Sequence, residues 1–128
     1  MKLLSIDHIT INLLKIEESI RFYEDVIGLS KIEDIDMGDH ILHLYQLPGA
    51  KLELIEYKGE QKIVQTGNTD IGVYRHFAVK VEDLEAASKE IEAAGYGVNL
   101  PISFIPQLNT SIMLIKDPNG VEIELVQA

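Results

Sequence analysis

Cysteine is absent from this 128-residue chain, which excludes disulfide bonds, thiolate nucleophiles and thiolate-ligated metals. Long apolar runs are missing as well. The first residues, MKLLSIDH, already include Asp7, so they predict neither a signal peptide nor a membrane span. We therefore expect a cytoplasmic protein that does not associate with membranes.

Basic residues are also scarce, with 11 Lys and Arg against 21 Asp and Glu, for a formal net charge of −10. No cluster of Lys or Arg stands out along the chain. This balance argues against nucleic acids and anionic lipids as partners, because both are bound chiefly through basic patches. It is compatible with attraction of a cation.

What the chain does contain is an internal repeat. Each half has a strand-like segment, then a helical segment, then three short apolar runs; the helices are expected at about residues 17–27 and 83–94. Glycines 28 and 95 stand at the expected helix ends, and DPNG at 117–120 predicts a tight turn in a hairpin. The length suits one domain, or two small modules that must share a sheet to bury enough surface.

Four potential metal ligands occupy matching places in the repeat. Glu53 follows His8 by 45 positions, and Glu124 follows His76 by 48. Because successive side chains of a strand point to opposite faces, each of these residues lies opposite the apolar stripe of its own strand. The sequence therefore predicts that all four line a polar sheet face, with the helices on the other face.

Several neighbouring residues leave alternatives open. Glu122 shares a face with Glu124 and is its rival as a ligand, whereas alternation would point Arg75 to the opposite face from His76, in a surface or interface role. In the run DHILHLYQL, His40 is interpreted as an ordinary strand or turn histidine. His43 and Tyr45 are candidates for the lining of a substrate pocket.

The ordered set DHITINL, SIRFYEDVIGL, KLELIEY, RHFAVKVED and DPNGVEIELVQ resembles the vicinal oxygen chelate superfamily over essentially the whole chain. That group includes glyoxalase I, methylmalonyl-CoA epimerase, extradiol dioxygenases and the bleomycin resistance proteins. The resemblance implies an α+β fold of two tandem βαβββ modules that form a curved open sheet. Module 1 would span about residues 1–60, a connector about 61–72 and module 2 about 73–128. It also implies a homodimer, in which one site draws ligands from two chains.

The resemblance places the metal ligands on His8, Glu53, His76 and Glu124, and the combination is most similar to bacterial glyoxalase I. Two imidazoles and two carboxylates suit a divalent metal, Ni or Zn first, with Co, Mn or Fe as alternatives. Glu124 or Glu53 would then act catalytically, by carrying a proton between carbons of a small-molecule substrate.

The function predicted from this resemblance is a metal-dependent lyase or isomerase that moves a proton through a metal-chelated enediolate. Asn12 and Tyr57, both expected in the substrate pocket, stand where glutathione-using relatives have a basic residue and an asparagine. This difference counts against a glutathione adduct as substrate. The alternatives are a non-catalytic antibiotic-binding protein of the bleomycin resistance type, an epimerase and an extradiol dioxygenase.

Overall fold

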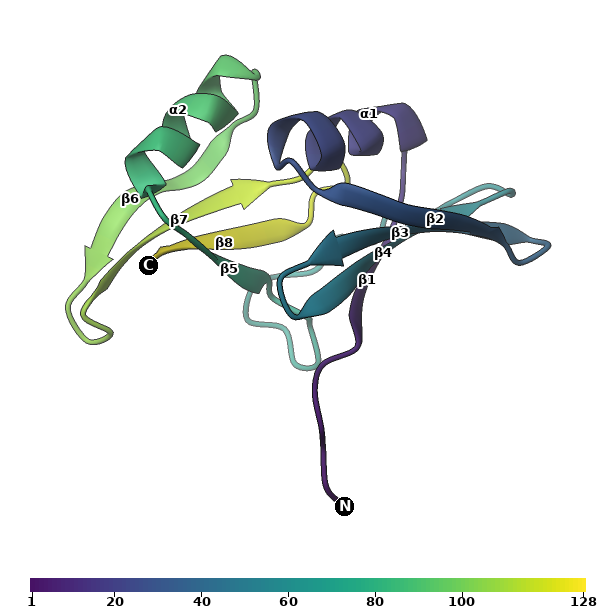
Figure 1. Ribbon diagram of the computed structural model, residues 1–128, viewed down its shortest axis with the longest axis horizontal. Helices are drawn as coiled ribbons and strands as arrows, with labels where there is room; N and C mark the ends of the chain where they lie inside the picture. Colours follow the sequence, from purple (N-terminus) through teal and green to yellow (C-terminus); the bar gives the residue numbers. More distant parts are fainter. The chain divides into compact units, whose positions relative to one another are not determined.

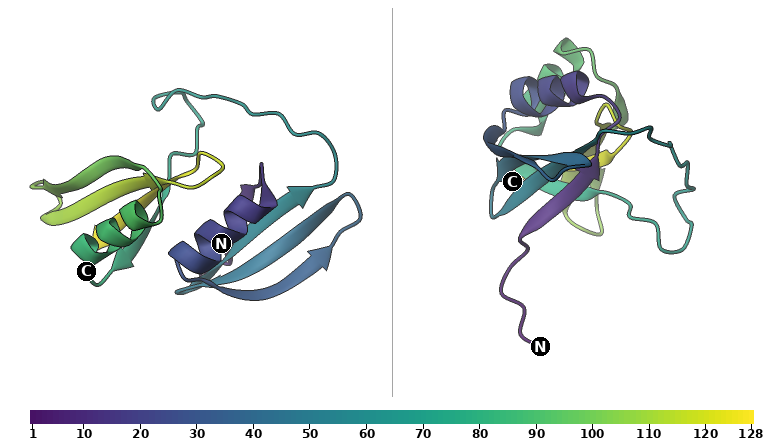
Figure 2. Two further views of the ribbon diagram at one scale, coloured as in Figure 1. Left: turned by 90° about the horizontal axis from the view of Figure 1, so that it is seen from above. Right: turned by 90° about the vertical axis from the view of Figure 1, so that its right-hand side faces the viewer.

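The computed structural model describes residues 1–128, which divide into two compact units, Met1–Lys62 and Ile63–Ala128. The boundary falls in a long connector between the last strand of the first unit and the first strand of the second, where residues 58–76 form only turns and bends (Figure 2). None of the helices has the length and apolar character needed to cross a membrane.

The first unit is a four-stranded mixed sheet in the order β1-β4-β3-β2, with β1 parallel to β4 and the other pairs antiparallel (Figure 1). Its helical segment follows β1 in the chain and lies against one face of this sheet (Figure 2). The elements are β1 (His8–Asn12), α1 (Ile16–Ile20), η1 (Arg21–Val26), β2 (Ser30–Asp36), β3 (His40–Leu47) and β4 (Ala50–Tyr57).

The second unit repeats this arrangement, with strand order β5-β8-β7-β6 and β5 parallel to β8. Helix α2 packs against β6, β7 and β8 on one face of the sheet (Figure 1). The expected α+β fold of two tandem βαβββ modules is confirmed. The elements are β5 (Phe77–Val81), α2 (Leu84–Ala93), β6 (Val98–Ile105), β7 (Thr110–Lys116) and β8 (Glu122–Gln127).

Each unit has its own apolar core between helix and sheet. In the first unit the fully buried side chains include Phe22, Tyr23, Leu52 and Leu54. In the second unit they come from α2 and from alternate positions of the strands: Leu84, Ile91, Met113, Ile115, Ile123 and Leu125. One sheet face of each unit is thus occupied by the helix, and the polar residues of the strands are left for the other face.

The first helix differs from the expected regular helix over 17–27. It begins as α1 and continues as the π-helical η1, in which the Ile27 N–H donates to the Phe22 carbonyl at 2.9 Å. The wider turns of η1 bury Phe22 and Tyr23, whereas Ile20 and Ile27 on either side of η1 are only half-buried.

The second helix follows its prediction closely. Asp83 caps it by accepting a hydrogen bond from the Ala86 N–H at 2.9 Å, and it ends just before Gly95, whose φ of +84° suits a helix-terminating glycine.

Candidate functional site

In the second unit, His76 and Glu124 lie side by side. His76 directly precedes β5, and the parallel register pairs Phe77 with Ile123 and Ala78 with Glu124. The pairing brings His76 Nε2 to 3.2 Å from Glu124 Oε2, with side chains that are 31% and 18% exposed. Both groups are therefore shielded from bulk water but still accessible to a small ligand.

The DPNG turn sets the position of β8. The Asp117 carboxylate accepts hydrogen bonds from the backbone N–H groups of Asn119 and Val121, both at 2.8 Å, and Gly120 has a φ of +85°. The predicted hairpin between β7 and β8 is confirmed, and it delivers Glu124 beside His76.

Glu122, the rival ligand, is already held by other side chains. Its Oε1 accepts from Arg75 Nη2 at 3.1 Å and its Oε2 from Asn99 Nδ2 at 2.7 Å. Strand alternation predicted that Arg75 points away from the site, but its side chain instead contacts Glu122. The reason is that β5 begins only at Phe77, so alternation does not extend back to Arg75.

In the first unit, Glu53 lies on the sheet face opposite the buried Leu52 and Leu54. The register of β1 with β4 places Thr10 across from Glu53, and Thr10 Oγ1 donates to Glu53 Oε1 at 3.2 Å. His8 lies two residues before Thr10 and therefore on the same face. Thr10, rather than His8, is the residue that contacts Glu53.

His8 has a carboxylate next to its ring. Its Nδ1 lies 2.7 Å from Asp7 Oδ2, and hydrogen bonds from His8 and then Lys51 lower the pKa of the Asp7 carboxyl. The Nε2 atom of His8 is left for another partner. In the second unit, His76 similarly has a carboxylate near Nδ1, with Glu122 Oε1 at 3.6 Å.

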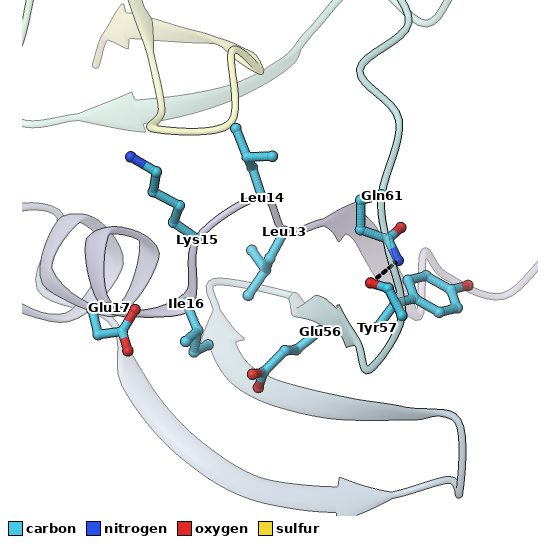
Figure 3. A pocket seen from close by; sticks show the side chains of 9 residues that line it. Leu13, Leu14, Lys15, Ile16, Glu17, Glu56, Tyr57 and Gln61 are labelled. Atoms are coloured by element: carbon cyan, nitrogen blue, oxygen red, sulfur yellow. Dashed lines mark hydrogen bonds between the residues drawn. The ribbon is translucent and has the colours of Figure 1, made fainter.

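Two of the four expected pocket residues lie at the edge of the ligand face in the first unit. Asn12 is exposed at the end of β1, on the face of His8 and Thr10, and Tyr57 is 37% exposed at the end of β4. Tyr57 lines a cavity of about 370 Å³ together with residues 13–17, 56, 59 and 61, and its ring points away from Glu56 (Figure 3). Glu53 does not line this cavity.

The other two expected pocket residues, His43 and Tyr45, lie on the wrong face, which corrects that prediction. They are 6% and 0% exposed, and the register places them opposite Leu54 and Leu52, on the helix-covered side of the sheet. His43 bridges Asp34 through Nδ1 at 2.7 Å and Glu56 through Nε2 at 2.9 Å. These contacts give His43 a structural role.

Tyr45 allows a test of this placement by pH. Burial and the hydrogen bond that it donates to Glu24 at 2.8 Å raise the pKa of its phenol. A raised pKa stabilises the folded state below the unfolded-state pKa of about 10, and this stability is lost as the pH rises beyond it.

Tyr45→Phe is therefore expected to lower the free energy of unfolding by about 1 kcal/mol at pH 7 through loss of the hydrogen bond. The difference in the free energy of unfolding between wild type and Tyr45→Phe should narrow above pH ~10, because only the wild type has this phenol to ionise on unfolding. Urea unfolding at pH 7, 9 and 11 measures both effects. A constant gap across this range would show that Tyr45 is not buried as described.

A divalent metal fits the donor types present, although no group of three or more His, Asp or Glu side chains lies close enough together to hold an ion. The second unit contributes an imidazole nitrogen, His76 Nε2, and a carboxylate oxygen in contact. The first unit offers the same two donor types on one sheet face. Nitrogen and oxygen donors of this kind suit Zn, Ni, Co, Mn or Fe(II).

A cavity of about 670 Å³ lies beside this pair, entirely within the second unit. Its wall includes Arg75, Asn99 and Glu122, together with Lys116 and connector residues 63–66 and 68. The lining mixes apolar side chains, amides and charged groups, which is typical of sites for small polar molecules. Sequence reasoning missed Asn99, because no periodic pattern signals its place in a pocket.

Comparison with known proteins gives matches over almost the whole chain. The sequence profile described as the Glyoxalase/Bleomycin resistance protein/Dioxygenase superfamily matches residues 5–125. A probable lactoylglutathione lyase of Vibrio cholerae is 30% identical over 126 residues, covering 94% of this chain and 88% of that protein.

Solved structures share the fold. A glyoxylase/bleomycin resistance protein/dioxygenase domain from Frankia sp. EAN1pec superposes with a TM-score of 0.82 at 18% identity, covering 99% of both chains. An antibiotic-binding protein from Streptomyces sp. CB03234 superposes with a TM-score of 0.75 at 17% identity, covering 99% of this chain and 98% of the other. At these identities the likeness shows the fold alone.

Proposed function

The chain belongs to the Glyoxalase/Bleomycin resistance protein/Dioxygenase superfamily, and from this premise we propose that it is a metal-dependent lyase or isomerase of the glyoxalase I type. The observation that carries the proposal is the contact of 3.2 Å between His76 Nε2 and Glu124 Oε2. In this reading His8 and Glu53 provide the remaining two ligands of one divalent metal, Ni or Zn. A homodimer and a cytoplasmic location stay predictions.

The metal would supply a Lewis acid that polarises adjacent oxygens of a bound substrate. The protein's own residues then have separate tasks. His8 and His76 provide neutral nitrogen donors, whereas Glu124 or Glu53 takes a proton from one substrate carbon and returns it to the next. The partial burial of Glu124 keeps water away from that proton.

We further propose that the substrate enters through the cavity of about 670 Å³. Its amide and cationic lining, with Lys116 exposed in the wall, fits a substrate that carries polar or anionic groups on an apolar body. Asn12 and Tyr57, in place of a basic residue and an asparagine, point to a substrate other than the glutathione adduct.

The test is to strip the protein with a chelator, titrate it with Ni²⁺ or Zn²⁺ by calorimetry, and assay it with hemithioacetals of methylglyoxal and several thiols. We expect one metal per chain and metal-dependent turnover of at least one hemithioacetal. Metal binding with turnover of an acyl-CoA epimer would instead support the epimerase alternative, and catechol-dependent oxygen uptake the dioxygenase. Folded protein that binds no metal would contradict the proposal.

One observation favours a second candidate, a small-molecule binding protein without turnover. Neither His76 nor Glu124 lines the large cavity, so a ligand seated there need not touch the metal ligands. This candidate predicts ligand binding that is unaffected by chelators. Tight binding of an apolar antibiotic by the chelator-treated protein, with no turnover in any assay, would favour it.

A further inference from the structure

The imidazole of His76 lies between two carboxylates that differ in their surroundings. On one side Glu124 Oε2 lies 3.2 Å from Nε2, and on the other Glu122 Oε1 lies 3.6 Å from Nδ1. The Nδ1 atom is buried and makes no hydrogen bond in this arrangement. An oxygen only slightly beyond hydrogen-bonding distance is thus the natural acceptor for a proton on that nitrogen.

Glu122 is itself fixed. Its side chain is 8% exposed, and a buried carboxylate requires charged or hydrogen-bonding partners. Arg75 Nη2 at 3.1 Å and Asn99 Nδ2 at 2.7 Å provide them, one on each carboxylate oxygen. Arg75 is in turn oriented by a hydrogen bond of 2.9 Å from its Nη1 to Asn68 Oδ1. The carboxylate therefore cannot swing towards Nε2 without losing both partners.

Glu124, in contrast, contacts His76 through its Oε2. The two glutamates are two residues apart on β8 and share a face, so each lies next to a different nitrogen of the His76 ring. A histidine that binds a metal must be neutral, with its proton on the nitrogen that faces away from the ion. A carboxylate at Nδ1 favours that tautomer, whereas Glu124 at Nε2 favours the opposite one as long as no metal is bound.

We propose that Glu122 is a positioning residue, which holds the His76 ring through Nδ1 so that Nε2 and Glu124 are presented together to the metal. This inference rests on the proposed metal-dependent function. The first unit offers a parallel, because Asp7 Oδ2 lies 2.7 Å from His8 Nδ1. Glu122 is thereby assigned a role distinct from that of a fourth ligand, which its contacts with Arg75 and Asn99 disfavour.

The decisive variant is Glu122→Gln, which keeps the size of the side chain but replaces one oxygen by an NH₂ group. In either orientation of the amide, the NH₂ group faces another donor, either Asn99 or the pair Arg75 and His76. Two donors cannot form a hydrogen bond with each other, so at least one contact of Glu122 is lost. We expect Co²⁺ and Zn²⁺ affinity to fall by roughly 10–100-fold. The Co²⁺ absorption spectrum at saturation should keep its wild-type shape, because the ligands are unchanged.

Two further variants serve as comparisons, one at a proposed ligand and one at a distant surface charge. Glu124→Gln should weaken metal binding more strongly and change the Co²⁺ spectrum. Glu85→Gln, on the exposed surface of α2, removes the same charge far from the sheet face and should leave affinity within about twofold of wild type. Wild-type affinity in Glu122→Gln would overturn the inference. So would loss of binding in Glu122→Gln with retention in Glu124→Gln, which would make Glu122 the ligand.

A readout on the apo-protein separates this inference from the proposed function. Long-range ¹H–¹⁵N NMR at neutral pH reports which ring nitrogen of His76 carries the proton. Because Glu124 stands at Nε2 and Glu122 at Nδ1, we expect both tautomers in the wild-type apo-protein and a shift towards the Nε2–H tautomer in Glu122→Gln. If the protein binds no metal but shows this change, the metal-dependent function fails and the role of Glu122 stands. The same tautomer populations in wild type and in Glu122→Gln would overturn the role of Glu122.

Discussion

His76→Ala is expected to remove stoichiometric binding of Ni²⁺ or Zn²⁺. The loss of affinity should exceed the roughly 10–100-fold that follows when only an outer partner of a ligand is removed. The reason is that His76 provides the nitrogen donor that lies 3.2 Å from Glu124. Removing it leaves the second unit with a single carboxylate donor, which binds borderline metals weakly without an imidazole beside it.

Elemental analysis of the purified protein and calorimetric titration of the apo-protein measure this effect. His40→Ala is the matched control, because it also removes a histidine but one at the start of β3, at no ligand position. The control should retain one metal per chain. Equal metal content in wild type, His76→Ala and His40→Ala would place any bound metal elsewhere and contradict the ligand assignment.

The proximity of His76 and Glu124 could be predicted because β8 has one clear apolar stripe. Ile123 and Leu125 are almost completely buried, so Glu124 between them must face the other way. The internal repeat identified the strand that follows His76 as the matching strand of the second half. The parallel pairing of that strand, β5, with β8 brings His76 next to Glu124. Where one face of a strand is apolar and the other polar, alternation determines the side of every residue.

The same reasoning failed in β3 because its sequence, HILHLYQL, has apolar residues on both faces. Leu42 and Leu44 share the face of His40, whereas Ile41 and Leu47 share that of His43 and Tyr45. Alternation groups these residues correctly but gives no sign of which group faces the helix. The deciding contacts, from His43 to Asp34 and Glu56, join three different strands and are invisible in a single segment.

Local irregularities account for the remaining differences. The register of β6 with β7 shifts between Val98 and Leu100, and Asn99 at this irregularity reaches Glu122. Arg75 precedes its strand, and η1 replaces a regular helical turn. None of these positions obeys a period of 2 or 3.6, so no periodic pattern could have assigned their direction.

Phe22→Ala is expected to cause the largest loss of stability, about 3–5 kcal/mol in the free energy of unfolding. Phe22 is 0% exposed, and its ring packs edge-to-face on Tyr23 with centroids 5.0 Å apart. The π-helical turns bury these two consecutive aromatic residues together. Truncation therefore loses both the transfer energy and the ring contact, and leaves a cavity that the rigid sheet beneath cannot fill.

Phe104→Ala is the matched control, because it makes the same chemical change at a side chain that is 58% exposed on β6. Urea unfolding followed by circular dichroism should place it within about 1 kcal/mol of wild type. For Phe22→Ala the expected loss is about a fifth or more of a typical total free energy of unfolding of about 5–15 kcal/mol, so its urea midpoint should fall steeply. Comparable losses in the two variants would mean that Phe22 is not in a closely packed core. Because the buried face is what forces Glu53 to the opposite side of its sheet, that result would also undermine the first unit's half of the metal site.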